Sequence, residues 1–282
     1  MSSRRARRRR DAVVRILLLI GALVAFLAPL AWTALASIGV LPDNVTSPPS
    51  LKGPITLDHF REVGVAEPTF WQELMTSTAA AACATALAIL CSFLAAFGLA
   101  RSRFIGKPLL TEGFLVLASL PAMAYVIPLS DLMRRVHLAD TFAGVVLTEA
   151  AVMTPLAVYV LHGALRQLSP EWEEAAVLDG AGLFRVLREV VLPLSAPTVA
   201  ATAIVLFVLA WNLLLVPLVL TSGEIKTIPV AMMDFFTFER ELDWPTAAAA
   251  LVISLIPVAI LGGVFHRVLE RFSLDARPQD IG

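Results

Sequence analysis

Residues 74–100 read LMTSTAAAACATALAILCSFLAAFGLA and contain no Asp, Glu, Lys or Arg. A helix of about 20 apolar residues, rising ~1.5 Å per residue, is long enough to cross the ~30 Å hydrocarbon core of a membrane. The strands of a membrane barrel are about half as long and alternate apolar with polar residues, so they do not fit this stretch. The stretch therefore predicts a transmembrane helix.

Five other stretches of the chain have the same character. Four of them lack charged residues, namely Ile16–Pro42, Gly113–Ser130, Val190–Gly223 and Trp244–Phe265, and the fifth, Thr141–Leu165, contains only Glu149. The whole chain is 58% hydrophobic and 16% charged, whereas soluble proteins average roughly 25% charged residues. We therefore predict an all-α membrane protein, a bundle of six transmembrane helices at about 13–38, 73–100, 109–133, 140–165, 195–221 and 245–270.

The distribution of basic residues predicts the orientation of these helices. Lys and Arg accumulate in cytoplasmic loops, and with the N-terminus inside, the cytoplasmic segments hold sixteen of the 22 basic residues. We expect a multi-pass protein of a bacterial cell membrane with a cytoplasmic basic N-terminus at 1–12, a transmembrane domain at 13–270 and a cytoplasmic tail at 271–282. A cleavable signal peptide is the alternative for the first helix, but the apolar run there is longer than the ~7–15 residues of such a signal.

The predicted cytoplasmic loop at 168–193 is the most informative connection in the chain. Ser169 is expected to cap a short helix that has Pro170 at its first position, and the acidic residues that follow favour a helix start. Gly180 and Gly182 are expected to end this helix, because glycine adopts the left-handed conformation that helix ends require.

A second short helix is predicted in the same loop, at about Leu183–Val191, and is expected to stop before Leu192-Pro193. The first helix has a face of small side chains at Ala175-Ala176. Two short helices with such a face, exposed to water, are well suited to docking into a groove of another protein.

One spacing within the loop resembles a known motif. Glu174-Ala175-Ala176 is followed after three residues by Gly180, after nine more by Val190, and after one more by Leu192-Pro193. This resembles the EAA loop of ABC importer permeases, EAA-x3-G-x9-I-x-LP, with Val190 in place of Ile. The resemblance implies that the loop couples the membrane helices to a separate ATPase.

The resemblance covers nearly the whole chain and is to the six-helix carbohydrate-type permeases related to the maltose and glycerol-phosphate importers. Other segments that carry it are Phe60–Val63, Ala95–Arg101, Phe104–Lys107, Ala210–Asn212 and Asp243-Trp244. The chain departs from the group at Leu213, where Asp is usual, and at 271–277, where RFSLDAR replaces a basic Gly-Leu-Thr-Ala-Gly tail. A contact between that tail and the ATPase is therefore not expected to carry over.

The resemblance implies a non-catalytic permease subunit of a bacterial ABC importer for a sugar or sugar derivative, with no metal and no cofactor of its own. The chain has no GxxxxGK[ST] loop to bind ATP, so two ABC ATPase subunits would hydrolyse it, beside a second homologous permease subunit and an extracytoplasmic solute-binding protein. The implied coupling residues are Glu174 for a polar contact, Ala175 and Ala176 for close packing, Gly180 for the turn, Asp179 and Arg185 as secondary contacts, and Leu192 and Pro193 at the end of the motif.

Three polar or aromatic residues within the predicted spans are candidates for the solute pathway. Ionisable side chains inside a membrane helix are costly and are often functional, so Glu149 could bind solute hydroxyls; the alternative is a neutral or paired residue between helices. Trp211 and Asn212 combine an aromatic ring with an amide, which suits a sugar, although an Asn that joins two helices fits equally well.

Other functions are weighed against this interpretation. The same type of importer could carry a glycerophosphodiester, an amino acid or a peptide. An ion-coupled secondary transporter would call for inverted repeats and broken helices, which the sequence does not display. A membrane enzyme would need a converging acid–base or metal site, and no such group is evident in the sequence.

Overall fold

The computed structural model describes residues 2–42, 51–52, 55–66, 68–223, 225–234 and 244–264. They fall into two compact units, Met1–Phe70 with Asp234–Leu255, and Trp71–Met233 with Ile256–Gly282, and each is described by itself. The predicted tail at 271–282 and the predicted end of the sixth helix, 265–270, lie outside the described residues.

The first unit is built around a long N-terminal helix. Its elements are α1 (Ser2–Ser37), the antiparallel pair β1 (Leu41–Pro42) and β2 (Leu51–Lys52), α2 (Asp58–Ala66) and α12 (Trp244–Ser254). Helix α12 contacts both α1 and α2, and its Thr246 hydroxyl donates a 3.2 Å hydrogen bond to Glu62 of α2. Along the predicted span of α1 most apolar side chains are exposed, Phe26 by 80%, as a helix facing lipid requires.

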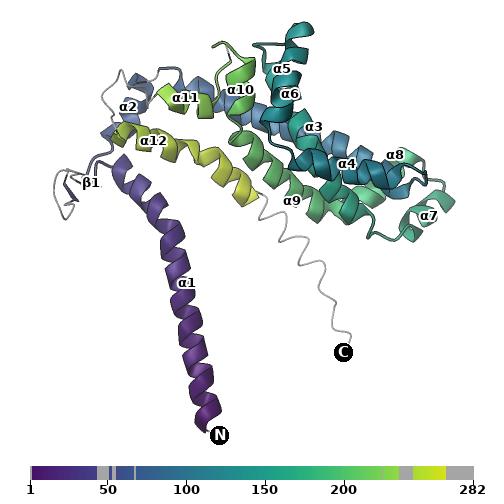
Figure 1. Cartoon of the computed structure of the whole chain (residues 1–282), viewed down its shortest axis with the longest axis horizontal. Helices are drawn as coiled ribbons and strands as arrows, with labels where there is room; N and C mark the ends of the chain where they lie inside the picture. The colour runs from purple at the N-terminus through teal and green to yellow at the C-terminus, as the bar shows by residue number, and fades with distance from the viewer. Residues whose placement is uncertain are drawn as a thin grey trace. The chain divides into compact units, whose positions relative to one another are not determined.

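The second unit holds the remaining helices. They are α3 (Phe70–Arg101), α4 (Lys107–Ser119), α5 (Met123–Arg135), α6 (Phe142–Leu165), α7 (Glu171–Leu178), α8 (Leu183–Val186), the π-helix η1 (Leu187–Val191), α9 (Leu192–Trp211), α10 (Leu215–Leu220) and α11 (Ile228–Asp234). Helices α7 and α8 lie together at one end of this unit, while α10 and α11 lie toward the other (Figure 1).

The predicted membrane helices are present in the described part of the chain. Five helical stretches are long and apolar enough to cross a membrane: Val14–Ser37, Phe70–Arg101, Phe142–Leu165, Leu183–Trp211 and Trp244–Val264. A sixth crossing results if the bent pair α4 and α5 is counted as one span. The prediction of an all-α bundle with up to six spans is confirmed.

The third predicted helix, 109–133, is not continuous. Helices α4 and α5 meet at an angle of 95°, and Leu120 between them has an extended backbone with φ −70° and ψ 145°. Proline disfavours the helical conformation in the residue before it, so Pro121 accounts for the break. The predicted continuous span was therefore wrong at Leu120.

The fifth and sixth predicted helices are interrupted as well. Helix α9 ends at Trp211, six residues before Pro217, and α10 begins at Leu215, two residues before it. Pro217 has no N–H to donate to the carbonyl of Leu213, so a continuous helix would lack that hydrogen bond. A turn at Leu255 likewise interrupts the stretch Trp244–Val264, two residues before Pro257. Proline thus locates each of these breaks.

The core at the α7 end of the second unit joins the loop to the membrane helices. Its buried members are Phe93 and Ala96 of α3, Leu161 and Leu165 of α6, and Val186 and Val191 of the loop. Because these side chains come from four elements, the loop is packed against the bundle rather than suspended from it.

Candidate functional site

Helix α7 begins one residue later than the sequence predicts. Its N-cap is Pro170, not Ser169, although the Ser169 hydroxyl still accepts a long hydrogen bond of 3.4 Å from the Glu171 N–H. Glu171, Glu173 and Glu174 occupy the first turn, where negative charge is favourable because the helix dipole is positive at that end.

Gly180 ends α7 in the predicted left-handed conformation, with φ +84°. Its N–H donates to the Val177 carbonyl and the next N–H, of Ala181, donates to the Ala176 carbonyl, both at 2.9 Å, which is the Schellman pattern of helix ends. Gly182 does not share this conformation. Its φ of −74° and ψ of 165° are extended, and it is the N-cap of α8, so its predicted role in ending α7 was wrong.

The second helix of the loop does not stop before Leu192-Pro193. Helix α8 continues through η1 directly into α9, and the Leu192 N–H donates to the Leu187 carbonyl five residues earlier. Pro193 has no N–H for the carbonyl of Glu189, and the wider π-turn accommodates this loss. The predicted break was therefore wrong, because a π-turn replaces it.

Helices α7 and α8 carry large apolar side chains that are exposed to solvent. We call four of them the α7–α8 surface: Trp172, Leu178, Leu183 and Phe184, of which Leu178 is 87% exposed. Clustered exposed apolar residues mark interaction sites.

Among the predicted coupling residues, Glu174, Ala175, Asp179, Gly180 and Arg185 are exposed on α7, on α8 and in the turn between them. Arg185 forms an exposed ion pair of 3.4 Å with Glu189. Ala176 differs, since it is half-buried and packs against the core of Val186 and Val191. Leu192 and Pro193 are exposed at the start of α9.

Arg101, the last residue of α3, binds the loop through a contact that the sequence reasoning missed. Its Nε lies 2.9 and 3.0 Å from the two carboxylate oxygens of Glu173, and its Nη2 lies 2.6 Å from Oε1. Nη2 also donates 3.2 Å to the carbonyl of Leu168. No local pattern links this pair, because the partners lie 72 positions apart. The available cues were an arginine at the end of one helix and an acid at the start of another.

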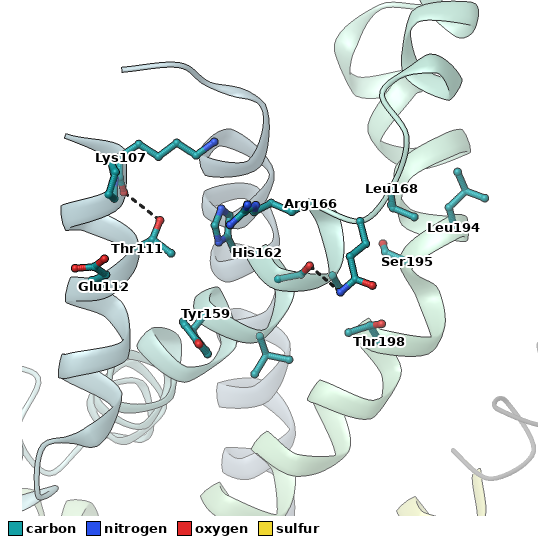
Figure 2. A pocket seen from close by; sticks show the side chains of 15 residues that line it. Lys107, Thr111, Glu112, Tyr159, His162, Arg166, Leu168, Leu194, Ser195 and Thr198 are labelled. Carbon is teal, nitrogen blue, oxygen red and sulfur yellow. Dashed lines mark hydrogen bonds between the residues drawn. The ribbon is translucent and has the colours of Figure 1, made fainter. Parts of the chain in front are cut away.

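A cavity of about 980 Å³ lies between α4, α6 and α9 near the loop. Figure 2 shows its lining, with Lys107 and Thr111 on α4, His162 and Tyr159 on α6, and Ser195 and Thr198 on α9. Glu112, Arg166 and Gln167 complete its polar wall. Hydroxyl, amide and charged groups that alternate with Pro108, Val160 and Leu194 can hold a polar solute with apolar faces.

The three predicted pathway residues do not line this cavity. Glu149 is 2% exposed, and its Oε2 has no hydrogen-bond partner among the described residues. Trp211 is buried and its ring stacks on Phe207 with centroids 6.1 Å apart. Asn212 is exposed at the end of α9 and donates 2.7 Å to the carbonyl of Val208 in its own helix. Sequence reasoning did not select Tyr159, His162 or Thr198, which line the cavity.

Residues 88–273 match the family of binding-protein-dependent transport system inner membrane components. The chain is 32% identical to the trehalose transport system permease protein SugB of Mycobacterium tuberculosis, over 86% of this chain and 88% of that protein. It is 30% identical to the trehalose/maltose transport system permease protein MalG of Thermococcus litoralis, over 93% of this chain and 95% of that protein. Its fold is similar to a chain of a bacterial ABC transporter involved in the import of the acidic polysaccharide alginate, with a TM-score of 0.75, 20% identity, and coverage of 92% of this chain and 96% of that chain.

Proposed function

We propose a function for this chain from one premise: it belongs to the family of binding-protein-dependent transport system inner membrane components. It is thus an integral membrane permease of the ABC transporter type. We propose that it is the permease subunit of a bacterial importer for a sugar or sugar derivative. Relatives named for trehalose and maltose transport support this solute class.

The observation that carries the proposal is the α7–α8 surface beside an EAA-type motif. A short helix pair with exposed apolar side chains, and with Glu174, Asp179 and Arg185 also exposed on it, has the composition of a docking face with a polar rim. We infer that an ABC ATPase subunit binds here, with Glu174 in polar contact, Ala175 allowing close approach and Gly180 fixing the turn. Ala176 would act from the inner side, by seating α7 on the core.

The proposed assembly contains two ABC ATPase subunits, a second homologous permease subunit and an extracytoplasmic solute-binding protein. The chain would hydrolyse no ATP itself. Closure of the ATPase pair around ATP would displace α7 and α8 and shift the membrane helices between inward-open and outward-open states. In this proposal both termini and the loop at 168–193 lie in the cytoplasm, and residues 13–270 form one membrane domain.

The cavity between α4, α6 and α9 is a candidate part of the solute path. In the proposed orientation it lies toward the cytoplasmic end, where an imported solute leaves. Its hydroxyl and amide groups, from Thr111, Tyr159, Gln167 and Thr198, are suitable partners for sugar hydroxyls. Glu149, Trp211 and Asn212 remain predictions for the deeper part of the path.

The test is ATP-dependent uptake into proteoliposomes that contain the co-purified complex, with labelled trehalose and maltose as probes. We expect uptake that vanadate abolishes. Glu174→Lys should abolish uptake, whereas Glu171→Lys, the same charge change in the same turn of α7, should retain most of it. Full uptake by Glu174→Lys at normal expression would contradict the docking site.

The same vesicles distinguish the solute classes. Uptake of a glycerophosphodiester, an amino acid or a peptide, with no uptake of either sugar, would replace the sugar assignment and leave the importer assignment intact. A purified complex without any ATPase chain would contradict the importer assignment itself.

A further inference from the structure

The contact between Arg101 and Glu173 joins two parts of the second unit that would otherwise touch through apolar side chains. Arg101 lies at the end of α3, and Glu173 lies in the first turn of α7. Two guanidinium nitrogens of Arg101 bind the carboxylate at 2.6–3.0 Å. Because the planar guanidinium engages both oxygens of the carboxylate, it fixes the direction as well as the distance between the helices.

The pair is also sheltered from water. The side chains of Arg101 and Glu173 are 20% and 14% exposed, whereas those of the ion pair Arg135–Asp131 on α5 are 77% and 61% exposed. Exposed pairs contribute little, because water and salt screen them, but a desolvated pair resists separation, since each partner would be left as a poorly solvated charge. The α3–α7 contact is thus of the kind that can keep two helices together when one of them is displaced.

The turn between α3 and α4 is connected to the cavity. The Lys107 ammonium donates hydrogen bonds to the carbonyls of Ala100 at 3.3 Å and Ser102 at 3.2 Å, the residues on either side of Arg101. Lys107 is the first residue of α4, and it lines the cavity together with Pro108, Thr111 and Glu112. A continuous series of polar contacts therefore runs from α7, through Arg101 and its neighbours, to the α4 wall of the cavity.

We propose that Arg101 is a positioning residue that makes α7 and the α3–α4 turn move as one body, so that a displacement of α7 reaches the cavity wall. The proposal rests on the function proposed above and adds the element that transmits the motion. A second contact serves the same end, because Arg101 also holds the Leu168 carbonyl at 3.2 Å, and Leu168 lines the cavity. Rigid transmission of this kind requires an element whose parts keep their arrangement in both states.

A distance measurement tests this rigid body without any solute. In a Cys83→Ser, Cys91→Ser background, spin labels at Glu171→Cys on α7 and Leu109→Cys on α4 report the separation of two exposed positions. In the full complex we expect one narrow distance distribution that ATP with vanadate leaves unchanged. With Arg101→Ala added, the distribution should broaden and change on ATP addition. Equally narrow, unchanged distributions in both proteins would overturn the proposal.

A functional measurement adds a readout that a merely structural role would not change. Arg101→Ala and Glu173→Gln should each lower trehalose uptake by about tenfold or more, a usual size for coupling between sites, while the complex still assembles and hydrolyses ATP. The double variant Arg101→Glu, Glu173→Arg should recover part of the uptake. Arg135→Ala, which breaks the exposed pair on α5, is the matched control and should leave uptake unchanged.

The outcomes separate this proposal from the function it rests on. If the wild-type complex takes up neither sugar, the sugar assignment fails, and the distance measurement still decides the role of Arg101. If the wild type transports and both single variants transport equally well, Arg101 is not a positioning residue. Loss of uptake together with loss of assembly in both single variants, with no recovery in the double variant, would also count against it.

Discussion

Two glutamates of the second unit occupy opposite kinds of site. Glu173, at the start of α7, is bound on both carboxylate oxygens by Arg101. Glu149, within α6, is 2% exposed and has an Oε2 without a hydrogen-bond partner among the described residues. The sequence singled out Glu149 because a charge in a membrane span is unusual, yet Glu173 is the one with a defined partner. Functional interest in a carboxylate therefore depends on what surrounds it more than on how unusual its place in the sequence is.

The largest effect should come from placing a lysine at position 149. A lysine inside a membrane helix costs up to about 3 kcal/mol of insertion free energy, and Glu149 is buried, with no hydrogen-bond partner for its Oε2 among the described residues. Glu149→Lys should therefore reduce the amount of protein in the membrane, measured by quantitative immunoblot of washed membranes. Normal amounts of a fully active protein would show that water or a neighbouring subunit reaches this site.

Reversing the charge at Glu173 should act differently, because a lysine there would face the Arg101 guanidinium in a contact that is largely shielded from water. The loss of the pair should cost about 2–3 kcal/mol, below the ~3–5 kcal/mol of fully buried pairs because both side chains keep some exposure. Glu173→Lys should reach the membrane in normal amounts. Its uptake should fall by about 100-fold, the factor that corresponds to a loss of about 2.7 kcal/mol. An uptake defect that scales with a loss of protein would remove the contrast with Glu149.

Replacing Gly180 in the turn between α7 and α8 should have a smaller effect, and the same replacement at Gly182 is its control. Gly180 has φ +84° and Gly182 has φ −74°, and neither position has an atom within 4 Å of an added Cβ. Gly180→Ala should cost about 1–2 kcal/mol of local stability, because L-residues disfavour the left-handed region, whereas Gly182→Ala should cost less. Hydrogen exchange of the α7 amides measures the difference, and equal protection in both variants would contradict it.

The smallest effect is expected for Glu149→Gln. The amide keeps the shape of the carboxyl group and cannot ionise, so the free energy of unfolding should change by less than ~1 kcal/mol if the group only fills space between helices. In that case thermal unfolding of the purified complex and trehalose uptake should both stay near wild-type values. A specific loss of uptake with unchanged stability would instead support the solute-pathway prediction for Glu149.

The sequence predicted what depends on local patterns. The apolar stretches located the membrane helices, and Gly180 located the end of α7, since glycine is favoured wherever φ must be positive. Hydropathy predicted one continuous span at 109–133, but the residue before Pro121 adopts an extended backbone, and the two halves meet at 95°. The size of a proline effect depends on how the two halves pack, which hydropathy does not encode.

The site could be predicted only in part, for a related reason. The motif at Glu174–Gly180 was visible because it is contiguous, whereas the α3–α7 contact and the cavity lining combine residues from distant segments. Nothing in a single sequence pairs Arg101 with Glu173 rather than with the neighbouring Glu171 or Glu174. That choice follows from the direction in which α3 ends, which only the folded chain determines.

The π-turn at Leu187–Val191 has a consequence for the rotational phase of the helix that continues into the membrane. On a regular α-helix, Val186 and Val191 would point about 140° apart, since each residue advances the helix by ~100°. Both side chains are nevertheless buried in one core cluster, because the wider turn brings them to the same side. The extra residue in that turn therefore determines which face of α9 contacts its neighbours when α8 is packed in its place. Deleting one residue of the turn would rotate α9 relative to α8, although the side chains of both helices would remain unchanged.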